Sequence, residues 1–201
     1  MAGKPKISVC IPTHNQAVYL GEALNSVLTQ TLQDFEIIIY DDASTDNTQE
    51  VLENFRDTRI RSFRQTRNAG IARNRNSCLE AARGEYIAWL DSDDIYHPEM
   101  LALQSSVLDR NPNIGLVHAA YEVVDHDGRK LPDWPLPFTC DMVESGREAF
   151  RELIISNYVT APTTLVRHAC HDKVGPYATD IGRSSTDWEM WLRLALVSDI
   201  A

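Results

Sequence analysis

Short apolar runs alternate with segments of helical periodicity over the first half of the chain. The runs predict buried strands at 6–11, 35–40 and 85–90, with a shorter strand at 60–64. Between them, apolar residues recur every three or four positions, which predicts helices at 20–28, 46–55, 69–82 and 98–109. Pro12 should stop the first strand, and Asp46 with Gln49 resembles a capping box. This alternation is typical of a wound α/β fold, with a mostly parallel sheet flanked by helices.

The pattern changes after residue 111. A strand over 115–124 leads towards a hairpin at Asp127-Gly128, and a proline-rich connector follows at 132–137. We then expect an amphipathic helix at 144–156, a strand at 162–167 and a last helix from Ser185. Because no end signal follows that helix, we expect the chain to be a piece of a longer protein. The prediction is one domain over 1–201, with halves at 1–110 and 111–201.

Composition and charge exclude several classes of protein. The 201 residues include 43% hydrophobic and 24% charged residues, which is ordinary for a globular domain. A net charge of −10 argues against binding to nucleic acid, and an anionic substrate would need a cation or a local basic cluster. No apolar segment is long enough to span a membrane, and the start lacks the apolar stretch of a signal peptide. The four cysteines form no CxxC pair, so we expect free thiols in a reducing cytoplasm and no zinc site.

Carboxylates follow two of the predicted strands directly. Asp41-Asp42 comes after the strand at 35–40, and Asp91-Ser92-Asp93-Asp94 comes after the strand at 85–90. Parallel strands deliver their carboxyl ends to one edge of the sheet, where ligands of open α/β proteins bind. Grouped carboxylates suit Mg²⁺ or Mn²⁺, held together with substrate phosphates. The alternative for the second group is a solvated acidic turn that caps the helix near Pro98.

Basic residues gather in a glycine-containing loop that opens the helix at 69–82. Arg67, Arg73 and Arg75 lie in and just after this loop. A helix N-terminus attracts anions, and the arginine fork matches phosphate oxygens. The alternative is a solvated helix face, which is a stronger alternative for Arg75 than for Arg73. The chain has no GxxxxGK[ST] motif and no GxGxxG after the first strand, so phosphate binding would rest on metal and basic residues.

The order of these motifs resembles that of the family 2 glycosyltransferases. The matching segments are Ile11–Asn15, Tyr40–Asp46, Asn68–Asn74, Leu90–Asp94 and Thr186–Leu194. Together they extend over essentially the whole chain. The resemblance implies a GT-A fold, a nucleoside-diphosphate-sugar donor, Mg²⁺ or Mn²⁺ as cofactor, and inversion at the anomeric carbon. It also implies that 1–110 binds the nucleotide sugar and that 111–201 supplies the acceptor side and the catalytic base.

The resemblance assigns roles residue by residue. The general base is Asp187, and the metal ligands are Asp93 and Asp94. The expected nucleotide-sugar-binding residues are Pro12, Thr13, Asn15, Asp42, Asn68, Gly70, Arg73, Asp91 and Ser92. One departure is Thr186-Asp187, where the family usually has Glu-Asp, so the residue just before the base is not acidic. The only other reading of Asp187 is a helix N-cap.

The resulting hypothesis is an inverting, metal-dependent glycosyltransferase. Its donor would be a UDP-sugar, although thymidine and guanosine diphosphates also serve the family. The acceptor would be a saccharide or lipid-linked hydroxyl in bacterial surface-polysaccharide synthesis, at the cytoplasmic face of the membrane, with any membrane attachment made by regions outside this chain. Two alternatives are a non-catalytic nucleotide-sugar-binding domain of a longer synthase and a sugar nucleotidyltransferase. A sugar nucleotidyltransferase would have a glycine-rich loop after the first strand, but this chain has Pro12-Thr13-His14-Asn15 in that place.

Overall fold

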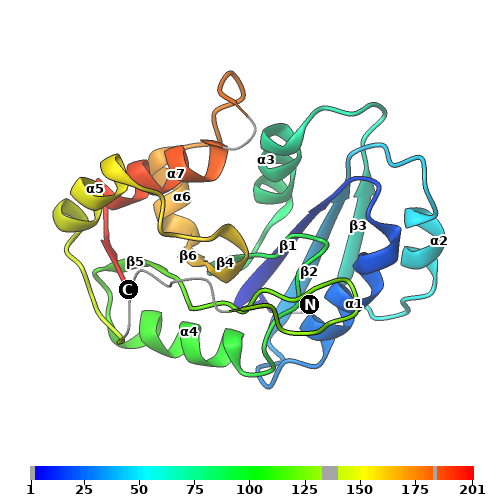
Figure 1. Cartoon of the computed structure of the whole chain (residues 1–201), viewed down its shortest axis with the longest axis horizontal. Coiled ribbons are helices and arrows are strands. Elements are labelled where there is room, and N and C mark those ends of the chain that lie inside the picture. Colours follow the sequence, from blue (N-terminus) through cyan, green and yellow to red (C-terminus); the bar gives the residue numbers. More distant parts are fainter. Residues whose placement is uncertain (1–2, 133–139, 183–184) are drawn as a thin grey trace.

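One sheet runs through the whole molecule and carries helices on both faces. The computed structural model describes residues 3–132, 140–182 and 185–201. Its seven strands lie in the order β3-β2-β1-β4-β6-β5-β7. Helices α3, α6 and α7 lie on one side of this sheet, and α4 lies on the other (Figure 1). Residues from both predicted halves therefore share one sheet.

The first four strands are parallel and form the predicted wound half. They are β1 (Ile7–Thr13), β2 (Phe35–Asp41), β3 (Ile60–Arg64) and β4 (Tyr86–Trp89). Every residue of β1 and β4 is buried, as expected for strands covered on both faces. The fold class is therefore confirmed, with a mixed sheet that is mostly parallel.

The helices of this half divide between two hydrophobic cores. They are α1 (Ala17–Leu28), α2 (Thr48–Glu53), α3 (Ile71–Ala81) and α4 (Met100–Arg110). One core packs α1, α2 and α4 against one face of the sheet. The other core joins α3 to the C-terminal helices on the opposite face. Alternate residues of β1 serve the two cores: Val9 belongs to the first and Cys10 to the second.

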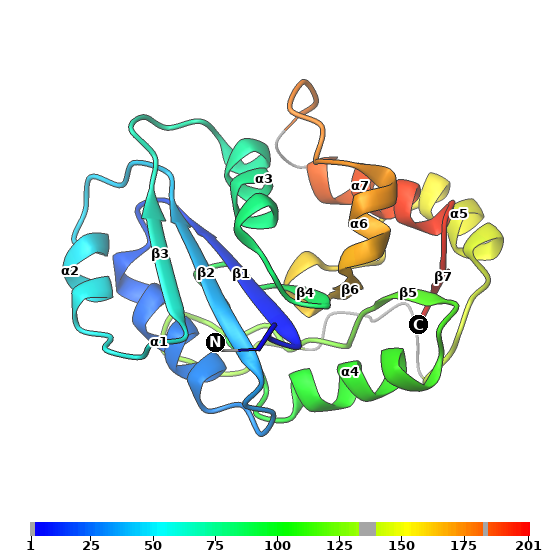
Figure 2. The same cartoon turned by 180° about the vertical axis from the view of Figure 1, so that it is seen from behind.

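The C-terminal half adds antiparallel pairing. Its elements are β5 (Ile114–Val117), α5 (Gly146–Ile155), a 3-10 turn (Ala161–Thr163), β6 (Leu165–Arg167), α6 (His168–Val174), α7 (Thr186–Ala195) and β7 (Asp199–Ile200). Strand β6 is antiparallel to both β4 and β5, whereas β7 is parallel to β5. Figure 2 shows α5, α6 and α7 grouped over this end of the sheet. Neither α6 nor β7 was predicted, because both are too short to show a clear period.

Three local predictions are wrong in informative ways. Strand β1 continues through Pro12, because the missing N–H of Pro12 faces the side where the shorter β4 has already ended. The predicted capping box is absent: Asp46 accepts from the backbone and side chain of Thr48, while Gln49 donates to Asp41. Strand β5 stops at 117, and only a short hairpin around Gly128 follows it.

Three further predictions concern the proline-rich connector, membrane-spanning helices and the cysteines. The proline-rich connector at 132–137 lies almost wholly outside them. Within the described ranges, no helix is both long and apolar enough to cross a bilayer. The thiols of Cys10, Cys78 and Cys170 are buried and free, as expected, whereas Cys140 is exposed.

Candidate active site

The carboxyl ends of β1, β2 and β4 meet at one edge of the sheet. Thr13 lies opposite Asp41 in the β1–β2 register, and the N–H of Leu90 donates to the carbonyl of Cys10 at 3.1 Å. The segments that follow these three strands therefore start side by side. This edge, called here the carboxyl edge, is the place that the sequence predicts for the site. The hydroxyl Oγ1 of Thr13 is buried there without a hydrogen-bond partner among the described residues.

Asp42 joins the end of β2 to the loop that opens α3. Its two carboxylate oxygens accept hydrogen bonds from the backbone N–H groups of Ala69 and Gly70, at 2.7 and 2.9 Å. Gly70 has φ 87°, a left-handed conformation that glycine adopts without a steric penalty. No atom lies within 4 Å of a Cβ placed on Gly70, so its backbone angle and not its space requires glycine. Asp42 thus holds the loop before α3, and this loop forms one wall of the candidate site.

His14 completes this wall, although the sequence gave no reason to single it out. Its Nδ1 lies 2.8 Å from the carbonyl oxygen of Asp42. Because a carbonyl only accepts, Nδ1 carries the proton and Nε2 is free to accept. The side-chain amides of Asn68 and Asn15 lie 3.1 and 3.3 Å from Nε2. The predicted residues Asn15, Asn68 and Asp42 are therefore brought together through His14.

Two residues at the carboxyl edge have the left-handed backbone that non-glycine residues rarely adopt. Asn15 has φ 55° and Ala43 has φ 58°. Asparagine tolerates this conformation, but alanine has no polar side chain to compensate. The N–H of Asn15 donates to Ser44 Oγ at 2.9 Å, and Asn15 Oδ1 accepts from the N–H of Thr45 at 2.7 Å. The two strained turns after β1 and β2 are therefore tied to each other.

The acidic segment after β4 has one buried and two exposed members. Ser92 is buried, whereas Asp93 and Asp94 are exposed. Asp93 accepts a long hydrogen bond of 3.4 Å from the amide of Gln16. Partial desolvation of the Asp94 carboxyl, and after it the charges of Asp91 and Asp93, raise the pKa of Asp94 to about 6. These carboxylates repel one another and would be stabilised by a cation.

The donor set fits a divalent ion that also binds phosphate. Among the residues described, no three histidine, cysteine or acidic side chains converge into a closed metal cage. Mg²⁺ is usually held by one or two carboxylates together with substrate phosphates, so a complete protein cage is not required. Asp93 and Asp94 have the hard oxygen atoms that such a site needs, and desolvation, followed by the charges of Asp91 and Asp93, raises the pKa of Asp94.

A second arginine of α3, Arg75, is buried against the site, whereas the predicted Arg73 is exposed. Arg73 is exposed, whereas Arg75 is only 5% exposed and its guanidinium lies 3.3 Å from Asp91 Oδ1. The spacing could have revealed this, because Arg75 lies three positions from the buried Ala72 and Cys78 and shares their face of α3. The solvated alternative was therefore wrong for Arg75.

Asp187 lies in the first turn of α7, half-buried. Its Oδ1 accepts from the N–H of Trp188 at 2.8 Å. The positive end of the helix dipole stabilises a carboxylate at this position. Trp188 and Trp191 donate their indole N–H groups to the backbone carbonyls of Leu153 and Val159, so both are packing residues.

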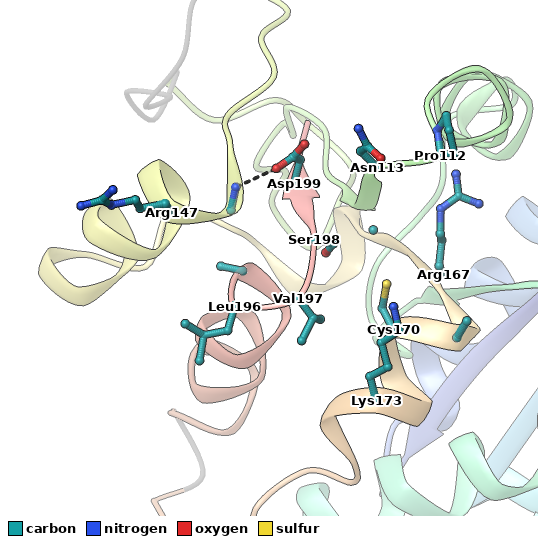
Figure 3. A pocket seen from close by; sticks show the side chains of 14 residues that line it. Pro112, Asn113, Arg147, Arg167, Cys170, Lys173, Leu196, Val197, Ser198 and Asp199 are labelled. Carbon is teal, nitrogen blue, oxygen red and sulfur yellow. Dashed lines mark hydrogen bonds between the residues drawn. The ribbon is translucent and has the colours of Figure 1, made fainter.

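A cavity of about 640 Å³ lies at the opposite edge of the sheet and does not belong to this site. Residues before β5, at the start of α5 and at the end of α7 line it (Figure 3). The N–H of Gly146 donates to Asp199 across its wall at 2.9 Å. Arg167, the most buried cation of this wall, already donates to the carbonyls of Leu108, Asn111 and Ile114. Because these hydrogen bonds tie the Arg167 guanidinium to the fold, it is not available to bind an anion in the cavity.

Comparison with known proteins agrees with the geometry of the carboxyl edge. The family model for Glycosyl transferase family 2 matches residues 8–172. An uncharacterized glycosyltransferase of Rickettsia felis is 39% identical over 127 residues, which are 63% of this chain and 21% of that protein. The Escherichia coli enzyme UDP-Glc:alpha-D-GlcNAc-diphosphoundecaprenol beta-1,3-glucosyltransferase WfgD is 35% identical over 121 residues, 60% of this chain and 47% of that protein.

A solved structure extends the similarity to almost the whole chain. The crystal structure of S. aureus TarS 1-349 in complex with UDP matches with a TM-score of 0.75 and 26% identity, over 98% of this chain and 57% of that one. The chain thus spans between 21% and 57% of the length of these three proteins. Because the family model matches well over half of the chain, and does so across the strands that build the carboxyl edge, this chain belongs to glycosyl transferase family 2.

Proposed function

We propose that this chain transfers a sugar, with inversion, from a nucleoside diphosphate to a hydroxyl group. The donor is a UDP-sugar, and the acceptor is a saccharide or a lipid-linked saccharide of a cell-surface polysaccharide. The observation that carries the proposal is the meeting of Thr13, Asp42 and Asp91–Asp94 at one edge of the sheet, with the buried Arg75 behind them. Carboxylates around a buried cation at a ligand-binding edge suit a charged donor better than a structural role.

The nucleoside would lie against the ends of β1 and β2. Pro12 and Thr13 would form the floor, and the buried hydroxyl of Thr13 has no hydrogen-bond partner among the described residues. The loop that contains Asn68 and Gly70 is held by Asp42 and forms the adjoining wall. The exposed Arg73 is free to approach the phosphates, as the resemblance implies.

The diphosphate would lie over the segment after β4. Asp91 and the buried Ser92 would orient the ribose. Asp93, with Asp94, would hold Mg²⁺ or Mn²⁺, which would neutralise charge on the leaving diphosphate. No step beyond this neutralisation is assigned to the metal.

Asp187 would act on the acceptor. It removes the proton from the acceptor hydroxyl as that oxygen bonds to the anomeric carbon, and the bond from this carbon to the phosphate oxygen breaks. The electron pair of that bond leaves with the nucleoside diphosphate, and the proton stays on Asp187. One displacement inverts the anomeric centre. The helix N-terminus and the N–H of Trp188 favour the ionised carboxylate that a base requires.

The relatives support the choice of donor and acceptor. TarS binds UDP in the matched structure, and the Escherichia coli relative is named for transfer of glucose from UDP to a lipid-diphosphate-linked sugar. We therefore choose UDP-glucose as the first donor to test. A GlcNAc-diphosphate-lipid is the first acceptor.

The test measures UDP release and the anomeric configuration of the product, in the presence of Mn²⁺. Wild type should release UDP and give the inverted product, and Asp187→Asn should lower kcat at least 100-fold, as expected for loss of a general base. The matched control Asp172→Asn, at an exposed position on α6, should leave the rate unchanged. UDP binding with no turnover of any donor and acceptor pair would contradict the proposal and favour a non-catalytic nucleotide-sugar-binding domain.

A further inference from the structure

Arg75 is a buried cation directly behind the carboxyl edge. Its side chain comes from α3 and is 7% exposed. One guanidinium nitrogen lies 3.3 Å from Asp91 Oδ1, and the guanidinium carbon lies 5.9 Å from the centre of the Trp89 ring and 5.7 Å from that of Tyr177. Arg75 thus lies beside the contacting rings of Trp89 and Tyr177 and points one end at a carboxylate of the site.

The fold alone does not explain this placement. Removal of a guanidinium from water costs several kcal/mol, which only well-formed partners can offset. Arg75 makes one long hydrogen bond, and its Nε has no partner among the described residues. Arg167 is a useful contrast, because its guanidinium donates to three backbone carbonyls that it links together. Arg75 contacts a carboxylate of the site, whereas Arg167 contacts backbone carbonyls.

The other side of Arg75 leads to the segment before α7. Tyr177, whose ring faces the guanidinium, is fixed to α3 by Asn76, whose amide donates to the carbonyl of Tyr177 at 3.0 Å and accepts from its N–H at 2.7 Å. In Figures 1 and 2 the N-terminal end of α7, which carries Asp187, is turned towards α3. Burial lowers the pKa of Arg75, but the charges of Asp91, Tyr177 and Asp187 outweigh it and raise the pKa overall. Asp91 therefore contacts the guanidinium directly, and Asp187 attracts it at longer range.

We propose that Arg75 is a positioning residue that serves both halves of the transferase site. It orients Asp91 for the donor nucleotide through direct contact and attracts Asp187 at longer range, so that one buried charge links the donor side to the base. This inference rests on the proposed function. It adds a residue that does not touch the reacting atoms and acts through two carboxylates that come from distant parts of the chain.

The donor arm of the test is calorimetric titration with UDP in the presence of Mn²⁺. Arg75→Met keeps much of the side-chain volume and removes the charge, whereas Arg75→Lys keeps the charge and loses the fork. We expect Arg75→Met to weaken UDP binding about tenfold, within the range for coupled neighbours, and Arg75→Lys to recover part of this loss. In an Asp91→Asn background, Arg75→Met should weaken UDP binding by less than about twofold, because its partner is already gone.

Arg167→Met is the control for a destabilised fold. It removes an arginine with more backbone hydrogen bonds from the opposite edge of the sheet, so it should lower the melting temperature and leave UDP affinity unchanged. Equal losses of UDP affinity in Arg75→Met and Arg167→Met would assign Arg75 to stability alone. Additive losses in the Arg75 and Asp91 variants would likewise overturn the inference.

The base arm uses the transfer assay. Arg75→Met should lower kcat by more than it raises KM, and should have little further effect on kcat in an Asp187→Asn background.

An active wild type with additive losses at Arg75 and Asp187 would overturn the link to the base and leave the proposed function intact. A wild type that neither binds UDP nor turns over a donor would overturn both. A wild type that binds UDP without turnover would overturn the proposed function and the link to the base, while the donor arm would still decide the link to Asp91.

Discussion

Replacement of Asp42 by alanine tests how the nucleotide wall is built. The Asp42 side chain is almost fully buried and accepts hydrogen bonds from the N–H groups of Ala69 and Gly70, at 2.7 and 2.9 Å. A hydrogen bond to a charged acceptor contributes about 1.5–3 kcal/mol. Because the loop is half-buried, water can reach the freed N–H groups in part. We therefore take the lower value, about 1.5 kcal/mol, for each hydrogen bond. The free energy of unfolding should therefore fall by about 3 kcal/mol.

The assay is urea denaturation followed by tryptophan fluorescence. Asp42→Ala should lower the midpoint with an unchanged slope, which marks a loss of stability and not of compactness. Asp125→Ala is the matched control, because Asp125 Oδ1 also accepts from two backbone N–H groups, both at 2.9 Å, but in an exposed turn. It should cost less than about 0.5 kcal/mol. Similar losses in the two variants, or a loss below 0.5 kcal/mol in Asp42→Ala, would refute the assignment of Asp42 as the anchor of the loop.

Three further predictions concern strain, protonation and packing. Ala43→Gly should raise the free energy of unfolding by about 0.5–1 kcal/mol, because the strain of alanine in a left-handed backbone exceeds the entropic cost of glycine. The control Ala102→Gly, within a helix, should lower the free energy of unfolding by about 1 kcal/mol. Chemical denaturation of both variants measures these changes. Burial, and after it the charges of nearby histidine and arginine side chains, lower the pKa of His171 from 6.5 to about 3. The stability that depends on neutral His171 is therefore fully present above pH 6.5 and is lost as the pH falls towards 3. Denaturation curves at pH 7 and 4 should show wild type losing about 3 kcal/mol more than His171→Leu, and equal losses would contradict the burial argument. Gly115→Ala should lower the melting temperature through clashes with the Ser198 side chain and the Cys170 sulfur, at a cost of about 1–3 kcal/mol, and Ser198→Gly in the same chain should restore part of the loss; no rescue would assign the clash to Cys170 and not to Ser198.

The sequence predicts the parallel half of the fold well because each signal there is local. The strand at 60–64 appears at the same residues, and β2 differs from its prediction by one residue. The convergence of Asp42 and Asp91 follows from two such strands and the geometry of a parallel sheet. The C-terminal half is less predictable, since the strands β6 and β7 have three and two residues and depend on their neighbours.

The parts of the site that escaped prediction depend on contacts between distant residues. His14 gains its role only because Asp42 and Asn68 fold onto it from two other loops. Ala43 carries no sequence signal for a left-handed backbone, because alanine ordinarily avoids that conformation. Arg75 is the exception, since its three-residue spacing from two buried positions on α3 predicts an inward direction.

The most direct test of the account is titration of UDP into wild type and Asp93→Ala, each with and without Mn²⁺. Wild type should bind UDP only when Mn²⁺ is present, and Asp93→Ala, folded as judged by an unchanged melting temperature, should lose this binding. Titrations with thymidine and guanosine diphosphates in parallel would show whether uridine is the preferred base. Binding of UDP with equal affinity in all four titrations would contradict the metal assignment, and no binding of any nucleotide by folded wild type would contradict the central claim that the carboxyl edge is a nucleotide-sugar site.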